Sequence, residues 1–232
     1  MTIKGIVFDL DGTLADFNLK YKTVRAEVRK FLLNQGIPSS ILSVKEKTFQ
    51  MLRKTQAYMQ NNGKGEHFSA VKKQVLSIAE KHELEAARET YLFPGTVETL
   101  RTLRQMDLKL GIFTINGKKS TDYILNNFRV GQFFDAIVTR ESVVNVKPDP
   151  SHLNTVLEML QISADEAIVV GDSIEDMKSA GALKAISVGL ASSTEDAKTL
   201  QTMGAKYSAK SITELPDLVL SLDPSKKRIR KS

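Results

Sequence analysis

The sequence predicts a doubly wound, Rossmann-like α/β core with a parallel sheet and a small all-helical domain inserted into it. Two observations indicate the core: short apolar, β-rich segments recur along the chain, and amphipathic helical patterns lie between them. A third indicates the insert, because residues 16–90 carry helical patterns and only weak strand signals. Strands that alternate with helices form right-handed crossovers, so we expect a parallel sheet covered on both faces.

Five segments are predicted to be buried strands. Each is a short, largely apolar run that polar or turn-forming residues end. The first, residues 3–9, stops at the Asp11-Gly12-Thr13 turn. The other four are residues 108–114, 134–138, 167–172 and 185–190.

Two helices of the core are predicted from their apolar faces and start signals. Val97, Leu100 and Leu103 fall on one face of a helix that precedes the second strand. Another helix begins at Asp149-Pro150, because Asp is a good N-cap and Pro fits the first helical position.

The insert contains helical repeats separated by Gly36-Ile37-Pro38 and Asn61-Asn62-Gly63, and the chain rejoins the core near Phe93-Pro94-Gly95. Open α/β sheets bind ligands at the carboxyl ends of their strands, so an insert directly after the first strand is expected to act as a lid. The repeating apolar residues are Tyr21, Val24, Val28, Phe31 and Leu32, then Val71, Val75, Ile78 and Ala79. The predicted domains are a core (1–15 and 91–224), a helical cap (16–90) and a basic tail (225–232).

The net charge of +6 comes mostly from the C-terminal tail. Its basic residues have no acidic neighbour among the last eight positions, so the rest of the chain is close to neutral. We expect a solvated, disordered tail and no nucleic-acid partner. The basic residues are Lys226, Lys227, Arg228, Arg230 and Lys231.

Composition excludes several classes of protein. The 232 residues are 41% hydrophobic, enough for a substantial core. The absence of cysteine excludes disulfides, thiolate metal sites and a cysteine nucleophile. No apolar run is long enough for a membrane span, and the N-terminus lacks a signal-peptide pattern. We therefore expect a soluble, cytoplasmic protein.

Polar residues follow the predicted strands where each one ends. Asp9 and Asp11 follow the first strand, Thr114 the second, and Asp172 and Asp176 the fourth. In a parallel sheet these ends meet at one edge, so the carboxylates should gather there. Two unit charges about 5 Å apart repel by about 3 kcal/mol at an effective dielectric near 20, so a cation is needed.

The donor types indicate which cation. Carboxylate oxygens without cysteine or clustered histidine favour Mg²⁺ over Zn²⁺. The histidines are scattered and are expected to be surface or helix-side residues: His67, His82 and His152.

Four motifs in order resemble those of the haloacid dehalogenase superfamily. They are Asp9-Leu10-Asp11-Gly12-Thr13, Thr114, Lys147-Pro148 and Gly171-Asp172-Ser173-Ile174-Glu175-Asp176. Phe93-Pro94-Gly95 is similar to the point where many members return from a helical cap. The likeness covers essentially the whole predicted core.

The resemblance implies catalytic roles. Asp9 would attack phosphorus to give an aspartyl-phosphate, and Asp11 would protonate the leaving alkoxide and then activate water. Lys147 would neutralise charge on the nucleophile and on the phosphoryl oxygens. Asp172, Asp9 and the backbone carbonyl of Asp11 would ligate Mg²⁺, while Asp176 would hold the metal's waters or Lys147.

The resemblance also implies phosphate-binding residues. Gly12 lets the backbone turn closely around the phosphate, and Thr114 would donate its hydroxyl. Many relatives place Asn or Ser directly after this Thr, whereas here Ile115 intervenes before Asn116, the remaining candidate contact.

Asp11 favours a phosphatase or a phosphomutase, because members that resemble dehalogenases and phosphonate hydrolases lack an acid two residues after the nucleophile. The arrangement resembles phosphoglycolate phosphatases, which implies a small anionic phosphate monoester as substrate. A β-phosphoglucomutase-type mutase stays open, with Lys20, Arg25, Arg53 or Lys54 to bind a second phosphate. A catalytically inactive scaffold that binds a partner or nucleic acid through its basic tail is the alternative from another class. The sequence does not predict an oligomeric state.

Overall fold

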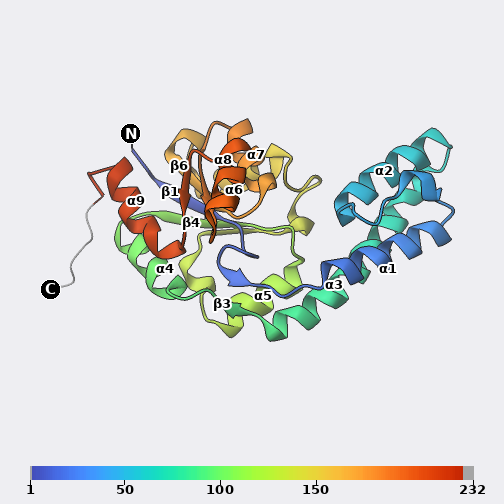
Figure 1. Ribbon diagram of the computed structural model, residues 1–232, viewed down its shortest axis with the longest axis horizontal. Coiled ribbons are helices and arrows are strands. Elements are labelled where there is room, and N and C mark those ends of the chain that lie inside the picture. Colours follow the sequence, from blue (N-terminus) through green and yellow to red (C-terminus); the bar gives the residue numbers. More distant parts are fainter. Residues whose placement is uncertain (1, 227–232) are drawn as a thin grey trace. The chain divides into compact units, whose positions relative to one another are not determined.

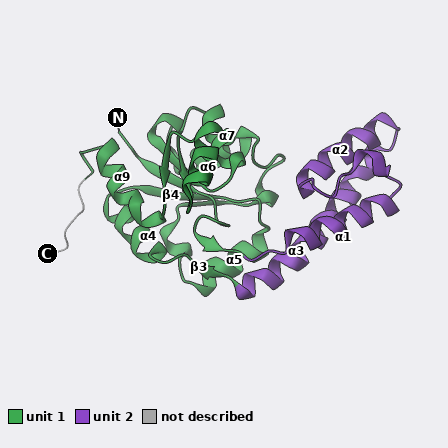
Figure 2. Ribbon diagram, viewed as in Figure 1, with its two compact units in different colours: residues 1–17, 90–232 green, residues 18–89 purple. Residues whose placement is uncertain are grey.

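A computed structural model describes residues 2–226, which form two compact units (Figure 2). One contains residues 1–17 and 90–232, and the other contains residues 18–89. The predicted insert, residues 16–90, differs from the second unit by two residues at its start and one at its end. Most of the predicted basic tail, residues 227–232, lies outside the described residues.

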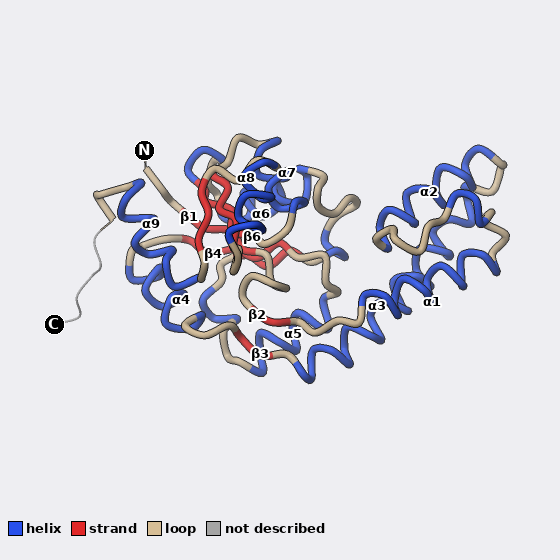
Figure 3. Tube along the Cα trace, in the orientation of Figure 1, coloured by secondary structure: helices blue, strands red, loops and turns tan. Residues whose placement is uncertain are grey.

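The predicted α/β fold is confirmed. Within residues 2–226 the main sheet has six strands, all parallel, in the order β5-β4-β1-β6-β7-β8 (Figures 1 and 3). The strands are β1 (Gly5–Phe8), β4 (Lys109–Phe113), β5 (Ala136–Val138), β6 (Ala167–Gly171), β7 (Ile186–Leu190) and β8 (Tyr207–Ala209). The sequence analysis did not predict β8, whose three residues are too few to show a periodic pattern.

Helices cover both faces of this sheet, with α6 and α7 on one face and α4 and α9 on the other (Figure 1). Helix α6 begins as predicted, because the Asp149 side chain accepts a hydrogen bond from the Ser151 N–H and Pro150 occupies the first turn. The core helices are α4 (Thr96–Gln105), α5 (Lys118–Asn127), α6 (Pro150–Leu160), α7 (Ile174–Ala182), α8 (Thr194–Thr202) and α9 (Leu215–Leu222). Short 3-10 helices in the core are η3 (Gly131–Phe133), η4 (Arg140–Ser142), η5 (Ala164–Glu166) and η6 (Ile212–Glu214).

Strand β1 lies at the centre of the sheet and pairs in parallel with β4 and β6. Its last residue, Phe8, is in register with Ile112 of β4 and Val170 of β6. The residues that follow these three strands therefore emerge side by side at one edge of the sheet. This register brings the first, second and fourth predicted strands together, although they lie far apart in sequence.

The helical unit has its own apolar core. Its helices are α1 (Tyr21–Asn34), α2 (Thr48–Asn61) and α3 (Phe68–Glu89), with the short 3-10 helices η1 (Ser39–Ile41) and η2 (Gly65–His67). The chain segments that lead into and out of this unit pair as two short antiparallel strands, β2 (Ala15–Asp16) and β3 (Tyr91–Leu92). The core residues are Val24, Val28, Leu32, Ile37, Leu42, Met51, Leu52, Met59, Val71, Val75 and Ala79.

The helical unit and the core without its basic tail carry opposite charges, which nearly cancel over residues 1–224. Residues 18–89 contain 14 Lys and Arg against 7 Asp and Glu, a net charge of +7. Residues 1–17 and 90–224 contain 14 Lys and Arg against 20 Asp and Glu, a net charge of −6. Among the described residues, no helix has the length and apolar character that a membrane span requires.

The contact between α6 and β4 yields a prediction. A Cβ added at Gly111 would lie 2.6 Å from Val156 Cγ1 and 3.1 Å from Leu160 Cδ1, so glycine permits the close packing of α6 on the sheet. We expect Gly111→Ala to lower the free energy of unfolding by about 1–3 kcal/mol through overpacking. The control is Gly181→Ala in α7, where a Cβ meets nothing within 4 Å and should stabilise the helix slightly. Equal effects of the two changes in urea unfolding would contradict this.

Candidate active site

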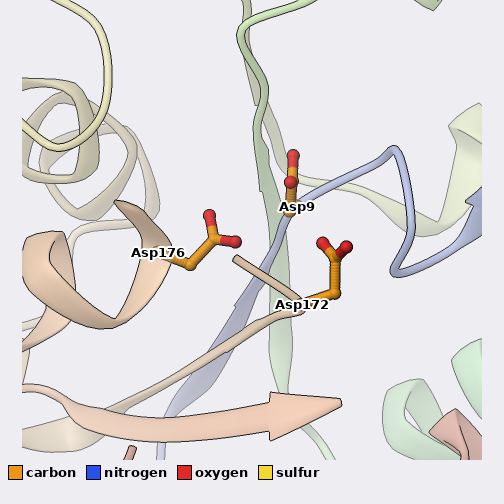
Figure 4. A group of neighbouring side chains, drawn as sticks. All are labelled: Asp9, Asp172 and Asp176. Atoms are coloured by element: carbon orange, nitrogen blue, oxygen red, sulfur yellow. The ribbon is translucent and has the colours of Figure 1, made fainter. Parts of the chain in front are cut away.

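Three carboxylates converge at the carboxyl edge of the sheet (Figure 4). Asp9 follows β1, Asp172 follows β6, and Asp176 lies in the first turn of α7. Each offers one oxygen, and these oxygens lie within 4.8 Å of one another. The structure therefore brings together three of the predicted acidic residues.

Two glycines make room for these carboxylates. Gly12 has a φ of +77°, and a Cβ there would lie 2.2 Å from Asp172 Oδ2. A Cβ at Gly171 would lie 2.3 Å from Asp176 Cγ. At both positions a side chain would occupy the space that a carboxylate fills.

Asp176 is fully buried and both of its oxygens are held. Oδ2 accepts hydrogen bonds from the Ser173 hydroxyl at 2.5 Å and from the Ser173 N–H at 3.1 Å, which forms the reciprocal cap of α7. Oδ1 accepts from Lys147 Nζ at 2.7 Å. Lys147, one of the two partners that the sequence left open for Asp176, is in contact with it.

The Lys147 ammonium lies between two carboxylates. Its Nζ is 2.8 Å from Asp9 Oδ1 and 2.7 Å from Asp176 Oδ1, and it lies 4.3 Å from the centre of the Phe113 ring. Burial disfavours the charged ammonium, but the negative charges of Asp176 and Asp9 outweigh this effect and raise the pKa of Lys147. Lys147 is therefore a buried, permanently charged group.

One ammonium does not balance the cluster. Burial raises the pKa of Asp9 to about 7; Lys147 opposes this rise, and Asp176 and Asp172 add to it. The Asp172 side chain reaches solvent, yet partial desolvation and the charges of Asp176 and Asp11 raise its pKa to about 6. When ionised, the three carboxylates and Lys147 carry a net charge of −2. A divalent cation would neutralise that charge, and the all-oxygen donor set fits a hard ion such as Mg²⁺.

The loop after β4 contains two of the predicted phosphate-binding residues, Thr114 and Asn116. Thr114 is fully buried, and its hydroxyl oxygen accepts a hydrogen bond from the Asn116 N–H at 3.2 Å. The Asn116 side chain is 3% exposed, and its NH₂ group has no hydrogen-bond partner among residues 2–226. A buried donor without a partner costs about 1–3 kcal/mol, so an acceptor such as a phosphate oxygen would stabilise this group.

Residues of η4, which follows the neighbouring strand β5, hold this loop in place. The buried Arg140 guanidinium donates to the Ile115 carbonyl at 3.3 Å and to Glu141 at 3.1 Å. Glu141 in turn accepts from the Lys118 N–H at the start of α5. Arg140 and Glu141 were not predicted from the sequence, because nothing in their spacing indicates a contact more than twenty positions away.

The remaining predicted site residue, Asp11, is partly buried and close enough for its charge to affect Asp172. His152 was expected to be a surface or helix-side residue, and it lies on α6 but is fully buried beside Lys147. Its spacing of four positions from the buried Val156 is the signal that could have indicated its burial.

Residues 6–190 match the model of the family described as haloacid dehalogenase-like hydrolase. The chain is 30% identical over 198 residues to a phosphoglycolate phosphatase of Pseudomonas putida. The aligned region covers 80% of this chain and 68% of that protein. It is 29% identical over 178 residues to the pyrophosphatase PpaX of Bacillus cereus, and the aligned region covers 76% of this chain and 78% of that protein.

Solved structures have the same fold. A hydrolase from Pseudomonas syringae superimposes with a TM-score of 0.65 at 27% identity, covering 97% of this chain and all of that one. A haloacid dehalogenase-type phosphatase from Thermococcus onnurineus superimposes with a TM-score of 0.62 at 21% identity, covering 98% of this chain and all of that one.

The fold and the acidic edge of the sheet thus define a hydrolase with a doubly wound α/β core. The chain belongs to the haloacid dehalogenase-like hydrolase family, as the motifs predicted. The predicted enzymatic class, a phosphatase of this family, is confirmed by its named relatives.

The close approach of Gly12 to Asp172 yields a second prediction. Gly12→Ala should lower the turnover of a phosphate monoester by about 10²-fold, because its Cβ displaces the Asp172 carboxylate. The matched control is Gly36→Ala, which has a similar φ of +81° but no atom within 4 Å of the added Cβ. Both changes should cost about 1–2 kcal/mol of stability through the left-handed backbone. Equal turnover in the two variants would refute the role of the contact.

The burial of His152 yields a third prediction. Desolvation, followed by the charge of Lys147, lowers the pKa of His152 from 6.5 to about 4. Between these values the unfolded chain binds a proton that the folded protein does not, so this histidine makes stability fall as the pH decreases from 6.5 towards 4. The complete loss is about 3 kcal/mol, since one pKa unit corresponds to about 1.4 kcal/mol.

The measurement compares the free energies of unfolding of the wild type and His152→Asn in metal-free buffer. The stability difference between them should change by about 2 kcal/mol between about pH 7.5 and pH 5, in favour of the variant at low pH. The cluster carboxylates are common to both proteins, so their titration cancels in the difference. A difference that does not vary with pH would show that His152 titrates normally.

Proposed function

We propose that this chain is a Mg²⁺-dependent phosphatase that hydrolyses a small phosphate monoester through an aspartyl-phosphate on Asp9. The observation that carries the proposal is the convergence of Asp9, Asp172 and Asp176, two of which, Asp9 and Asp176, contact the Lys147 ammonium. Phosphoryl transfer needs a positioned nucleophile and neutralisation of phosphate charge, and this cluster supplies groups for both.

In the proposed first step, an Asp9 carboxylate oxygen attacks phosphorus and the ester P–O bond breaks. Asp11 gives its proton to the leaving alkoxide. In the second step Asp11 removes a proton from water, which attacks phosphorus and breaks the bond to Asp9. Phosphate leaves, and Asp9 and Asp11 return to their starting states.

Lys147 supports the choice of Asp9 as nucleophile. Its ammonium is 2.8 Å from Asp9 Oδ1, and the Leu10 N–H donates to the same oxygen at 2.7 Å. These two donors hold one oxygen and so orient the other towards the substrate. They also favour the ionised carboxylate that nucleophilic attack requires.

Asp9, Asp172 and the backbone carbonyl of Asp11 would hold Mg²⁺, consistent with the net negative charge and oxygen donors of the cluster. The bound ion would neutralise charge on the transferring phosphoryl oxygens. Thr114 and Asn116 would bind those oxygens from the neighbouring loop, because the unpartnered Asn116 NH₂ needs an acceptor.

For the substrate, we propose a small anionic phosphate ester of the phosphoglycolate type. Named relatives act on phosphoglycolate and pyrophosphate, both small anions. The net charge of +7 on the helical unit also favours an anionic ligand. That this unit acts as a cap, and that the protein is cytoplasmic, stay predictions.

The test is a screen of phosphate monoesters and pyrophosphate with Mg²⁺, comparing the wild type with Asp9→Asn. We expect turnover by the wild type to be abolished by EDTA and restored by Mg²⁺. Asp9→Asn should lose at least about 10³-fold in kcat, because an amide is a poor nucleophile. Phosphoglycolate should be among the preferred substrates.

Asp165→Asn provides the control, since Asp165 is exposed and lies on the short helix before β6. It should keep wild-type kcat. Near-normal turnover by Asp9→Asn would exclude the covalent mechanism, and turnover that survives EDTA would exclude the metal.

A further inference from the structure

The buried His152 connects two segments that contain site residues. Its Nδ1 accepts a hydrogen bond from the Lys147 N–H at 3.3 Å, and its Nε2 is 3.3 Å from the Val138 carbonyl oxygen at the end of β5. The ring is 0% exposed and packs edge-on against Phe113, with 5.7 Å between ring centres. Nothing in the phosphatase chemistry proposed above uses this histidine.

These partners determine where the imidazole carries its proton. The Lys147 amide always carries hydrogen, so Nδ1 must present a lone pair to it. The Val138 carbonyl always accepts, so the proton must be on Nε2. A neutral imidazole with Nε2–H is the only form that satisfies both partners, and it makes His152 a fixed bridge between them.

The Val138 carbonyl extends the bridge to the phosphate-binding loop. The same oxygen accepts the Thr114 N–H at 3.0 Å. His152 thus joins the backbone that carries Lys147 to the backbone that carries Thr114. Phe113, which precedes Thr114, contacts both the His152 ring and the Lys147 ammonium.

Lysine has a long, flexible side chain, so its ammonium stays between Asp9 and Asp176 only if its backbone is fixed. We propose that His152 is a positioning residue that fixes the Lys147 backbone relative to Thr114, and thereby aligns the ammonium with the nucleophile. This inference rests on the role of Lys147 in the proposed function. It assigns His152 no contact with substrate or metal.

Three substitutions separate the two hydrogen bonds. The Asn Oδ1 is as many bonds from Cα as the His Nδ1, so His152→Asn can still accept from Lys147. The Gln Nε2 corresponds to the His Nε2, so His152→Gln can reach only Val138. His152→Phe keeps a ring against Phe113 and makes neither bond. Val156→Ala, one turn further along α6, is a control for lost core packing, because Val156 is fully buried and the change removes neither hydrogen-bonding group of His152.

With a phosphate monoester and Mg²⁺, His152→Phe and His152→Gln should each lose about 10²-fold in kcat, since a misplacement near 1 Å has that effect. His152→Asn should stay within about tenfold of the wild type, and Val156→Ala within about twofold. The variants that lose the acceptor for the Lys147 N–H should therefore lose the most kcat, and the variants that keep it should lose the least. Losses of kcat that instead follow the thermal stability of the four variants would overturn the proposal.

Hydrogen exchange of the Lys147 N–H gives a readout that does not depend on turnover. Exchange should become at least about tenfold faster in His152→Phe and His152→Gln, and stay slow in His152→Asn and Val156→Ala. Unchanged exchange in His152→Phe would overturn the proposal, as would faster exchange with unchanged kcat. If the wild type lacks Mg²⁺-dependent turnover, the proposed function fails, and exchange alone decides whether His152 fixes Lys147.

Discussion

The ion pairs of Lys147 are the interaction on which the rest of the site depends. The ammonium is within 3 Å of both Asp9 and Asp176, and it belongs to neither of the strands that bring those residues together. Without it, Asp9 and Asp176 would lose these ion pairs, while oxygens of Asp9, Asp172 and Asp176 lie within 4.8 Å of one another. Removing one partner of a buried ion pair leaves a desolvated charge, which is strongly destabilising. The ion pairs of Lys147 therefore contribute both to the arrangement of the site and to the local stability of this edge of the sheet.

Backbone geometry makes this crowding possible. Gly12 and Gly171 leave the space that Asp172 and Asp176 occupy, and parallel pairing of β1 with β4 and β6 aligns the strand ends. Burial raises the pKa values of Asp9 and Asp172, and the negative charge that remains after Lys147 is counted adds to this rise. The crowded carboxylates are unfavourable in the free protein, but they make the site suited to a divalent cation and a phosphate ester.

Much of the fold could be predicted because its signals are local. The apolar runs that form β1, β4 and β6, and the Asp149-Pro150 start of α6, need only neighbouring residues to be recognised. The short strand β8 escaped prediction because three residues carry no periodicity. The acidic site residues were predictable from their position after strands. Arg140 and His152 were not, since their roles arise from contacts between elements.

The sequence by itself determined the alternation of strands and helices, the insert after the first strand, and the residue types at the carboxyl edge. These follow from periodicity and from the chemistry that carboxylates, a lysine and a hydroxyl can perform. Only the tertiary structure decided that Asp176 contacts Lys147, that the Asn116 NH₂ has no partner within residues 2–226, and that His152 accepts a hydrogen bond from the Lys147 N–H. Each of these depends on a distance between side chains or backbones on different elements, and packing sets such distances after the elements have formed.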